Sequence, residues 1–581
     1  LFGSALTEQR VAAMFCHAVS TFLTPCLTDK TNNARPTRVT PLRPGVRLTA
    51  KTSLSPHSTP LRVGARAPKA IRRSLQVRAT VSDVGSKKTS ALGSDVEKVD
   101  VVVVGAGATG LTMAFTVAKK LGSKTSVVVT EARDVVGGNI TTRTEGPYTW
   151  EEGPNSFQPG DPILEVACDV GLQDDILLAD PGSYRFVLWD GALRALPASP
   201  ADAVFGDFLT FPGKIRAGLG AIGIKPPPPD KEESVKEFVS RNLGEEAFGR
   251  LIEPFCSGVY AGDPAKLSAP AAVGKVHRLE GLGGSLFAGA VKAGKEAKAN
   301  KKPRDERLPE VKGQTVGSFR GGLKKLPEAL ANALPTYPRL NWKLVSLTKS
   351  KEGTELVYDT PEGKKTIIAK AVLLTAPAYV ASDVLQTAAP EASEALSKFY
   401  YPPVCSVTVV YPQSAFRDQP HGKGPPGPPG AGFGQLHPRT QGVRTLGTIY
   451  SSSLFPERSP NGEVMLLHYI GGAQDPTLID MADEEIAAQT HKDCLQTLLK
   501  PGAEMPKVLG VKRWPKAIPQ FNVGHLDLQK EARAALSKAG LDGVFLGGNY
   551  MTGVALGRVV EYGRDAAADI IAYVEEQKVQ A

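Results

Sequence analysis

The pattern of apolar and polar positions predicts a parallel β-sheet that begins near residue 100. Residues 100–104 form a run dominated by valine, as in a strand that is buried on both faces. A glycine-rich turn at 105–110 follows, then a helix-like stretch at 111–121 and a second apolar strand at 126–130. This order of strand, turn, helix and strand is typical of the first unit of a doubly wound α/β domain.

The turn has the chemistry of a dinucleotide site. It reads Gly-Ala-Gly-Ala-Thr-Gly, and Glu131 stands at the end of the second strand. Glycines let the backbone turn tightly and approach a pyrophosphate, whose charge is favoured by the N-terminus of the following helix. The carboxylate of Glu131 can accept hydrogen bonds from a ribose. A chance glycine turn is the alternative, and the complete order of elements favours the nucleotide.

A second glycine pair, Gly137 and Gly138, follows Glu131 after a short interval. Two glycines here allow another close backbone approach, which a ligand needs when it continues past the pyrophosphate towards a flavin ring. A nicotinamide fold does not require this pair. An ordinary loop is the alternative, and the spacing after the acid favours a flavin.

The C-terminal region repeats this arrangement. Residues 544–546 resemble a strand, Gly547 and Gly548 interrupt it, and residues 553–573 predict a helix whose positive end would face the flavin. A packing glycine before a terminal amphipathic helix is the alternative. If both regions face the flavin, the nucleotide domain is assembled from separated segments, and a strand near residues 369–375 joins it.

The first insertion between these segments begins with a predicted β-hairpin. Two strands at 185–189 and 192–196 flank an Asp-Gly turn, which is the strongest short-range hairpin signal. A charged stretch at 296–312 and a Gly-Pro loop at 422–432 predict exposed linkers.

A helical region is expected over residues 198–295, interrupted by four consecutive prolines at 226–229. One side of it is apolar, with Lys214 and Arg216 alongside. Such a surface suits a helix that lies on a membrane, and it equally suits a helix packed inside the protein. The apolar residues are Phe205, Phe208, Leu209, Phe211, Ile215, Leu219 and Ile222.

The positive charge of the chain is concentrated at its N-terminus. The 581 residues, enough for two or three domains, carry a net charge of +10. Residues 1–95 hold fifteen Lys and Arg against four Asp and Glu, which leaves 54 basic and 55 acidic residues in the remainder. This acid-poor segment with 22 Ser and Thr predicts an organelle transit peptide, cleaved near Ala79. A basic tail for nucleic acid is the alternative, but its Lys-rich blocks and interleaved aromatics are missing.

Cysteine spacing and hydropathy narrow the class of protein further. The six cysteines form no Cys-X-X-Cys pair and do not cluster with histidines, so neither a metal site nor a disulfide framework is expected. No stretch of about twenty apolar residues predicts a membrane span. No Ser-His-Asp arrangement or pair of catalytic carboxylates can be read from the sequence.

Several longer motifs carry a family resemblance. Glu131-Ala132-Arg133 followed by the glycine pair resembles the flavin amine oxidase superfamily, and further motifs resemble its protoporphyrinogen oxidases. With Asn139-Ile140 after the glycine pair, the chain resembles the plastid form. The likeness extends from about residue 96 to the C-terminus, and its motifs lie at 150–157, 251–264, 432–438, 446–452 and 546–550.

The resemblance implies an activity and its setting. It implies non-covalent FAD, oxidation of protoporphyrinogen IX with molecular oxygen as acceptor, hydride transfer to the flavin and no catalytic protein base. It also implies that the protein is in the chloroplast, attached to one side of a membrane, on the stromal side of the thylakoid or envelope. No nucleic-acid partner is expected, and a homodimer is left open. An amine oxidase or a carotenoid-desaturase-like flavoenzyme of the same superfamily is the alternative, and a non-catalytic flavin-binding scaffold is a third.

The expected fold class is mixed α/β, similar to p-hydroxybenzoate hydroxylase. It comprises a Rossmann-like FAD-binding domain built from discontinuous segments, a substrate domain with a large mixed sheet, and an inserted helical membrane-binding domain. The expected boundaries are 1–95 (leader), 96–180, 313–377 and 536–577 (FAD-binding), 181–197 and 378–535 (substrate), 198–295 (helical) and 296–312 (linker).

The resemblance also assigns site residues. The substrate residues are Arg185 for a propionate, Phe433 for packing against a ring, and Gly262 for a backbone contact; an ordinary hairpin arginine and a core phenylalanine are the alternatives for the first two. No metal ligand is expected. The FAD residues are Gly105, Ala106, Gly107, Ala108, Thr109, Gly110, Glu131, Ala132, Arg133, Gly138, Asn139, Gly153, Pro154, Asn155, Ser156, Val345, Gly548, Val554, Ala555 and Leu556.

Overall fold

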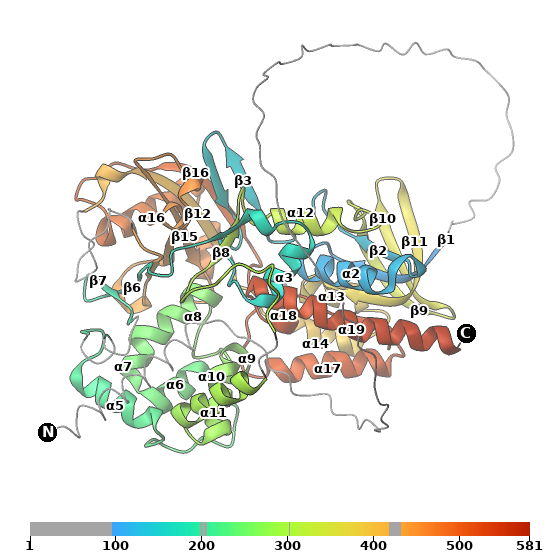
Figure 1. Cartoon of the computed structure of the whole chain (residues 1–581), viewed down its shortest axis with the longest axis horizontal. Helices are drawn as coiled ribbons and strands as arrows, with labels where there is room; N and C mark the ends of the chain where they lie inside the picture. The colour runs from blue at the N-terminus through green and yellow to red at the C-terminus, as the bar shows by residue number, and fades with distance from the viewer. Residues whose placement is uncertain (1–95, 198–201, 203–205, 301–302, 418–430, 581) are drawn as a thin grey trace, which may run out of the picture. The chain divides into compact units, whose positions relative to one another are not determined.

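The computed structural model describes residues 96–197, 202, 206–300, 303–417 and 431–580 (Figure 1). The predicted leader, most of the Gly-Pro loop and Phe205 lie outside the described residues. Two large sheets, two short two-stranded sheets and a group of helices make up the described part. Among these residues, no helix has both the length and the apolar character needed to cross a membrane.

The first sheet confirms the predicted nucleotide fold. Its strand order is β2-β1-β11-β10-β9, with β17 added on β11. β1 pairs in parallel with β2 and β11, and β11 pairs in parallel with β17, so three distant parts of the chain share one sheet. The strands are β1 (Val96–Val104), β2 (Val127–Thr130), β9 (Lys343–Ser350), β10 (Gly353–Thr360), β11 (Gly363–Leu374) and β17 (Val544–Leu546).

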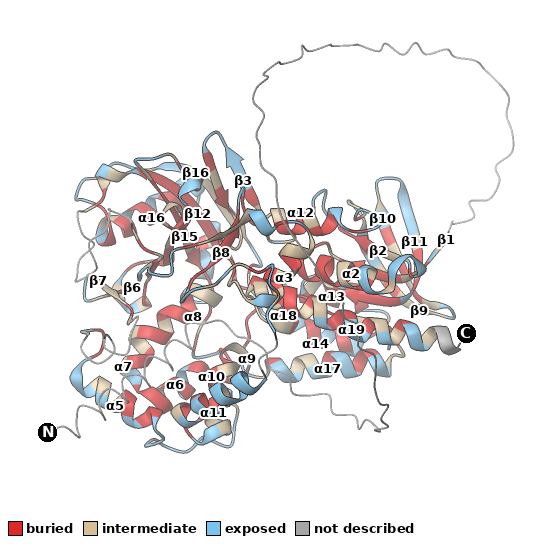
Figure 2. Ribbon diagram, in the orientation of Figure 1, coloured by how far each residue is buried: buried red, intermediate tan, exposed pale blue. Residues whose placement is uncertain are grey.

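Helices cover both faces of this sheet, which explains the uninterrupted valines of β1 (Figure 2). Val101 and Val103 face one core, whereas Val102 and Val104 face the other. The first core includes α2 (Ala108–Leu121), α3 (Asp161–Asp169), α12 (Lys325–Asn332) and α19 (Leu556–Gln580). The second includes α13 (Ala378–Leu385), α14 (Pro390–Ser397) and α17 (His525–Lys538).

The predicted start of the C-terminal helix was wrong by a few residues. A short helix, α18 (Asn549–Thr552), comes first, and α19 begins at Leu556. Gly553 separates them because its φ of 118° lies outside the helical region.

The second sheet has the strand order β16-β12-β15-β14-β13-β6-β7. β6 and β7 confirm the predicted hairpin, since Asp190 and Gly191 have φ values of 51° and 69°, as in a type I′ turn. β6 also pairs in parallel with β13. The strands are β6 (Arg185–Trp189), β7 (Ala192–Ala195), β12 (Val404–Pro412), β13 (Gly434–Leu436), β14 (Thr445–Tyr450), β15 (Glu463–Gly471) and β16 (Lys507–Trp514), with α16 (Asp483–Thr497) packed against them.

Two short two-stranded sheets lie outside these larger ones. β3 (Thr142–Glu145) pairs with β4 (Tyr148–Glu151), and β5 (Ile176–Leu178) pairs with β8 (Gly317–Phe319).

The predicted helical insertion forms its own hydrophobic core. The prolines at 226–229 lie between two of its helices, as expected. The last helix continues to Ala299, inside the stretch expected as a linker. The helices are α5 (Phe211–Ala221), α6 (Val235–Leu243), α7 (Glu245–Ala247), η3 (Phe248–Ile252), α8 (Glu253–Tyr260), α9 (Ala269–Ala272), α10 (Gly274–Gly283) and α11 (Leu286–Ala299).

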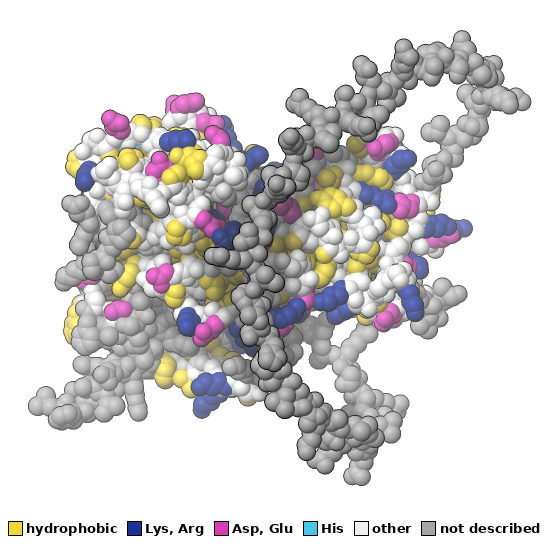
Figure 3. All heavy atoms as spheres, turned by 45° about the horizontal axis from the view of Figure 1, so that its top comes forward, with side chains coloured by type: hydrophobic (Ala, Val, Ile, Leu, Met, Phe, Trp, Pro, Cys, Tyr) yellow, Lys and Arg dark blue, Asp and Glu magenta, His cyan; other side chains and the backbone are white. Residues whose placement is uncertain are grey.

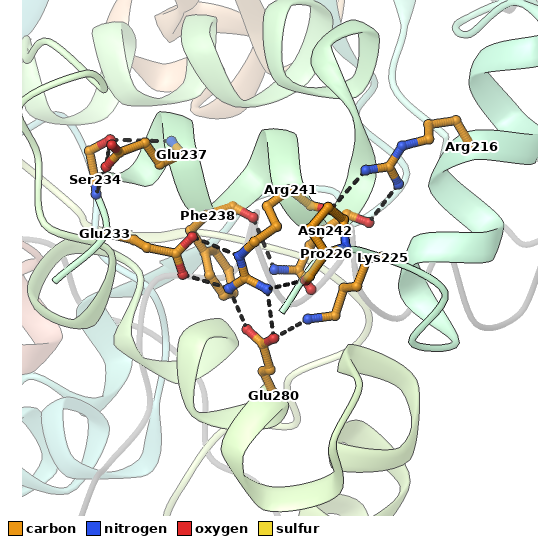
Figure 4. Close-up of polar contacts among 10 residues, drawn as sticks. All are labelled: Arg216, Lys225, Pro226, Glu233, Ser234, Glu237, Phe238, Arg241, Asn242 and Glu280. Carbon is orange, nitrogen blue, oxygen red and sulfur yellow. Dashed lines mark hydrogen bonds and ion pairs between the residues drawn. The ribbon is translucent and has the colours of Figure 1, made fainter. Parts of the chain in front are cut away.

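A buried ion cluster ties this insertion together (Figure 4). Arg241 of α6 donates to Glu233 at 2.5 and 2.7 Å and to both oxygens of Glu280 at 2.8 Å. Lys225, beside the prolines, also contacts Glu280. The cluster therefore joins the proline segment, α6 and α10.

Arg216, which the sequence places beside the apolar side of this region, makes its contacts inside the insertion. Its guanidinium points to the C-terminus of α6 (Figure 4) and donates to the carbonyl oxygens of Ser240, Arg241 and Asn242 at 2.8–3.3 Å. Because the last carbonyls of a helix lack intrahelical partners, this arginine satisfies them and is only partly exposed.

The ion cluster predicts a specific acid sensitivity. Burial alone would raise the pKa of Glu280, but hydrogen bonds from Arg241 and Lys225 lower it to about 2. The stability that this carboxylate contributes is therefore complete above its ordinary pKa near 4.5 and is lost as the pH falls from there towards 2. We expect Glu280→Gln to lower the urea midpoint clearly at pH 7 and much less at pH 3. An equal loss at both pH values would contradict this account.

Candidate active site

The glycine turn after β1 is held by backbone and hydroxyl contacts. The N–H of Gly105 donates to the carbonyl of Thr130 at 2.8 Å, and its φ of 106° requires glycine. Thr375, at the end of β11, donates its hydroxyl to the carbonyls of Val104 and Gly105 at 2.8 and 3.1 Å. A Cβ on Gly110 would overlap the carbonyl oxygen of Gly105. Sequence reasoning missed Thr375, although its position directly after a sheet strand was the available signal.

The N-terminus of α2 is open to a ligand. Gly107 is its N-cap residue, and no side chain caps the helix. The buried carboxylate of Glu131 lies beside it and accepts from the N–H groups of Ala106 and Arg133 at 2.9 and 3.1 Å. This carboxylate, together with an uncapped helix end and a glycine turn, suits a ribose next to a diphosphate.

The second glycine pair packs directly on the first turn. The N–H of Gly137 donates to the carbonyl of Ala106 at 2.8 Å. A Cβ on Gly138 would lie 3.3 Å from the Cα of Gly107, and Arg133 donates to the carbonyl of Gly138 at 2.5 Å. The two glycine motifs therefore form one cradle with little side-chain bulk.

The loop after β4 crosses this cradle. A Cβ on Gly153 would overlap the carbonyl of Asn139, so the two backbones are in close contact. The second sheet holds the loop from the other side, because Tyr469 donates to the carbonyl of Gly153 at 2.8 Å and Trp514 to that of Glu152 at 2.9 Å. Pro154, Asn155 and Ser156 continue from this point, and Asn155 is buried.

The C-terminal segment reaches the same place (Figure 1). A Cβ on Gly563 of α19 would lie 2.7 Å from the carbonyl of Thr109 in α2, and a Cβ on Gly548 would lie 3.2 Å from that of Thr375. The remaining predicted residues of this segment, Val554, Ala555 and Leu556, form the entry to α19.

Val345 lies in β9, an edge strand of the first sheet. It occupies a β-bulge in β9 and is 39% exposed. The nearby Trp342 donates its backbone N–H to the carbonyl of Glu131 at 2.8 Å, so this strand starts beside the acid.

The structure brings together two of the three predicted substrate residues. Arg185 lies opposite Gly434 in the β6–β13 pairing, and its guanidinium carbon lies 4.5 Å from the ring centroid of Phe433. Arg185 also donates to the carbonyl of Gln314 at 3.0 Å. Burial lowers the pKa of Arg185, and no carboxylate of the described residues forms an ion pair with it. A partly desolvated guanidinium over an aromatic ring is suited to a carboxylate of an incoming ligand.

Gly262, the third predicted substrate residue, does not contact Arg185 or Phe433. Its neighbour is Gln520, whose Oε1 would lie 2.5 Å from a Cβ on Gly262. Gln520 donates to the carbonyl of Tyr260 at 2.8 Å, while its buried Oε1 has no hydrogen-bond partner among the described residues. Gln520 is a second polar residue that no sequence motif indicated.

The residues present fit a flavin dinucleotide. The cradle is lined by glycine backbone, the helix N-terminus is uncapped, and Asn155 keeps a buried side-chain nitrogen with no partner among the described residues. A family model described as flavin containing amine oxidoreductase matches residues 108–571. The chain belongs to the flavin-containing amine oxidoreductases. Its cofactor is therefore FAD.

Comparison with individual proteins shows which members of this family the chain is similar to. Over 519 residues the chain is 53% identical to the chloroplastic protoporphyrinogen oxidase of Oryza sativa subsp. japonica, covering 89% of this chain and 96% of the relative. It is 49% identical to chloroplastic protoporphyrinogen oxidase 1 of Arabidopsis thaliana, over 86% of this chain and 94% of the relative. Cyclohexylamine oxidase from Brevibacterium oxydans IH-35A has the same fold, with a TM-score of 0.56 at 17% identity over 83% of this chain and 99% of that one. This flavin-containing amine oxidoreductase thus combines the family fold with close similarity to plant enzymes.

Proposed function

We propose that the chain oxidises protoporphyrinogen IX to protoporphyrin IX with FAD, molecular oxygen being the final acceptor. Its identity of about half with chloroplastic protoporphyrinogen oxidases, over nearly their whole length, is the observation that carries this proposal. The direct test mixes purified protein with protoporphyrinogen and oxygen and follows porphyrin fluorescence. An FAD-loaded protein that produces no porphyrin would refute it.

The side chains near β6 and β13 suit this substrate. FAD, when bound, supplies the acceptor for a hydride from the macrocycle. Arg185 offers a propionate a cation that no carboxylate of the described residues neutralises, and Phe433 offers a flat apolar surface to a pyrrole ring. The chain's task is therefore to orient the macrocycle and exclude water, and we propose no catalytic protein base.

Replacing Arg185 should separate substrate binding from cofactor binding. We expect Arg185→Ala to raise KM about tenfold with unchanged FAD occupancy, because a charge-assisted hydrogen bond is lost outside the glycine cradle. Phe433→Ala should act in the same direction. Arg194→Ala on the neighbouring strand β7 is the control, since Arg194 pairs with Asp207 and should leave KM unchanged. Loss of FAD from the Arg185 variant would make this residue structural.

Other activities of the family are distinguished by simple measurements. An amine oxidase would turn over an amine, and a carotenoid desaturase has no evident need for a cation at Arg185. A non-catalytic scaffold would bind FAD that protoporphyrinogen cannot reduce under anaerobic conditions. Anaerobic bleaching of the flavin by protoporphyrinogen, with no amine turnover, supports the proposed function over all three.

The exposed face of α5 supports membrane association. Five apolar side chains on α5 and just after it are exposed, which we call the α5 patch: Phe211 (76%), Ile215 (48%), Leu219 (41%), Ile222 (43%) and Ile224 (62%). Such a row would bury apolar area in the interfacial region of a bilayer. We propose that the chain binds a chloroplast membrane from one side through this patch.

Charged replacements in the α5 patch should release the protein from lipid. We expect Phe211→Glu with Ile215→Glu to lower the fraction that sediments with phosphatidylcholine–phosphatidylglycerol vesicles at least fivefold, because two apolar anchors become charges. Met505→Glu is the control, since Met505 is 52% exposed and lies outside the patch. Equal sedimentation of all three proteins would remove α5 from the membrane interface.

The remaining proposals concern location and organisation. We propose import into the chloroplast by residues 1–95, and the stromal side of the thylakoid or envelope as the location. The division into FAD-binding, substrate and helical domains stays a prediction, but α13, α14 and α17, which the predicted boundaries place largely in the substrate domain, pack on the first sheet. Residues 96–581 have almost balanced charge, and Figure 3 shows acidic and basic side chains interspersed on the face that it displays, in keeping with no nucleic-acid partner. A homodimer stays a prediction, which light scattering of the purified protein tests.

A further inference from the structure

Arg458 is a buried arginine that joins the segment between β14 and β15 of the second sheet to β8 and to the loop after β4. It ends the short helix η6 (Pro456–Arg458), which follows β14 and α15 (Ser451–Leu454), and it is 4% exposed. Its Nη1 donates to Oδ1 of Asn155 at 2.6 Å. Its Nη2 donates to the backbone carbonyl of Asn155 at 3.2 Å and to the hydroxyl of Ser318 at 3.1 Å.

The charge of Arg458 is balanced without Asn155. Glu151, at the end of β4 and 1% exposed, lies 3.5 Å from Arg458 Nη2. The carboxylate is held in place by the N–H of Leu323 at 2.8 Å and the hydroxyl of Thr142 at 2.7 Å. The contacts with Asn155 are therefore additional to the ion pair between Arg458 and Glu151. Their effect is to set which way the Asn155 amide faces.

The direction of the Asn155 amide follows from the chemistry of its partner. A guanidinium can only donate, so Oδ1 must face Arg458 and Nδ2 must point away from it. Nδ2 is buried and has no partner among the described residues. Because buried donors in folded proteins are almost always satisfied, this nitrogen is available to an acceptor on a bound molecule, either water or a ligand.

The surroundings of Asn155 identify that molecule by its chemistry. The loop carrying it crosses the second glycine pair, where the backbone of Gly153 contacts Asn139. The pyrimidine end of a flavin carries carbonyl oxygens, which are acceptors. We propose that Arg458 is a positioning residue that turns the Asn155 amide so that Nδ2 donates to the flavin ring system. The inference rests on the proposed flavin site, and it assigns to Arg458 a role that none of the sequence motifs indicated.

Titration of the apoprotein with FAD tests the proposal without catalysis. Asn155→Leu removes the amide at similar volume, while the pair Glu151→Gln with Arg458→Met removes the orienting arginine without stranding a buried charge. We expect each to raise the Kd for FAD about tenfold and to shift the visible flavin absorption in the same way. Combining all three changes should raise Kd no further than Asn155→Leu alone, because both act through one hydrogen bond.

Controls keep the outcome decisive. Arg320→Met removes an exposed ion pair with Glu457, next to Arg458 in the chain, and should leave Kd unchanged. If the paired variant fails to fold, Arg458→Lys should also raise the Kd for FAD, because it keeps a cation opposite Glu151 but loses the two-point contact with Asn155.

Additive effects of the changes on Kd, or an unchanged Kd and spectrum in Asn155→Leu, overturn the proposal. A change confined to KM for the porphyrinogen overturns it as well. Failure of the proposed function would instead show as porphyrin-inactive wild-type protein with normal FAD affinity.

Discussion

Gly110→Ala should weaken FAD binding about a hundredfold while the rest of the protein stays folded. The added Cβ would overlap the carbonyl oxygen of Gly105, which Thr375 holds in place through its hydroxyl. The turn and the first residues of α2 must then separate, and overpacking of this kind costs about 1–3 kcal/mol. The backbone donors would no longer converge on the diphosphate. Flavin absorbance per protein after desalting, with circular dichroism for the fold, measures the effect.

A glycine without a structural constraint provides the control. A Cβ on Gly294 of α11 would meet no neighbouring atom within 4 Å, and this residue is exposed. Gly294→Ala should therefore keep full FAD content and strengthen its helix slightly. Stoichiometric flavin in the Gly110 variant would show that the turn does not bind the diphosphate.

Arg241→Met should destabilise the helical insertion by about 3–5 kcal/mol, because one partner of a buried ion cluster is removed and the other charges remain. Lys225 would still contact Glu280, but the Glu233 side chain, 5% exposed, would lose both of its hydrogen bonds. The measurement is the midpoint of the first urea transition. FAD content should change little in the absence of urea, since the cluster lies in the insertion.

An arginine on the surface gives the comparison. Arg307 pairs with Asp305 and Asp169, but its side chain is 47% exposed. Arg307→Met should therefore lower the midpoint of the first urea transition only slightly, because surface ion pairs contribute little to stability. If Arg241→Met and Arg307→Met lowered the urea midpoint equally, burial would not increase the contribution of the ion cluster to stability.

Local patterns predicted much of the fold. The valine run, the glycine turn and the Asp-Gly hairpin each have a short-range physical cause, and the structure has β1, α2 and the β6–β7 hairpin in those places. The α19 boundary was misplaced because Gly553 falls in a sequence that otherwise reads as helix. The sequence left open whether Arg216 lies at a surface or inside the protein, because a basic side chain beside an apolar face does not reveal which carbonyl groups lie near it.

The site was less accessible to sequence reasoning. The glycine motifs indicated a cradle because glycine acts through its own backbone, and the structure packs them together. Three residues make their contacts with groups that are distant in sequence: Thr375, Gln520 and Arg458. No spacing in the sequence could therefore connect them with the glycine turn or with the loop after β4. Arg185 and Phe433 were assigned by resemblance, and their stacking depends on the pairing of β6 with β13.

The division of the first sheet among distant segments affects how the protein is made. β17 and α19 come from residues 544–580, and α19 packs along α2 beside the glycine turn. A nascent polypeptide therefore cannot complete this sheet and its helical cover until residues 544–580 have left the ribosome. A truncation that removes only α19 should yield colourless protein even though the glycine motifs at 105–110 and 137–138 are intact.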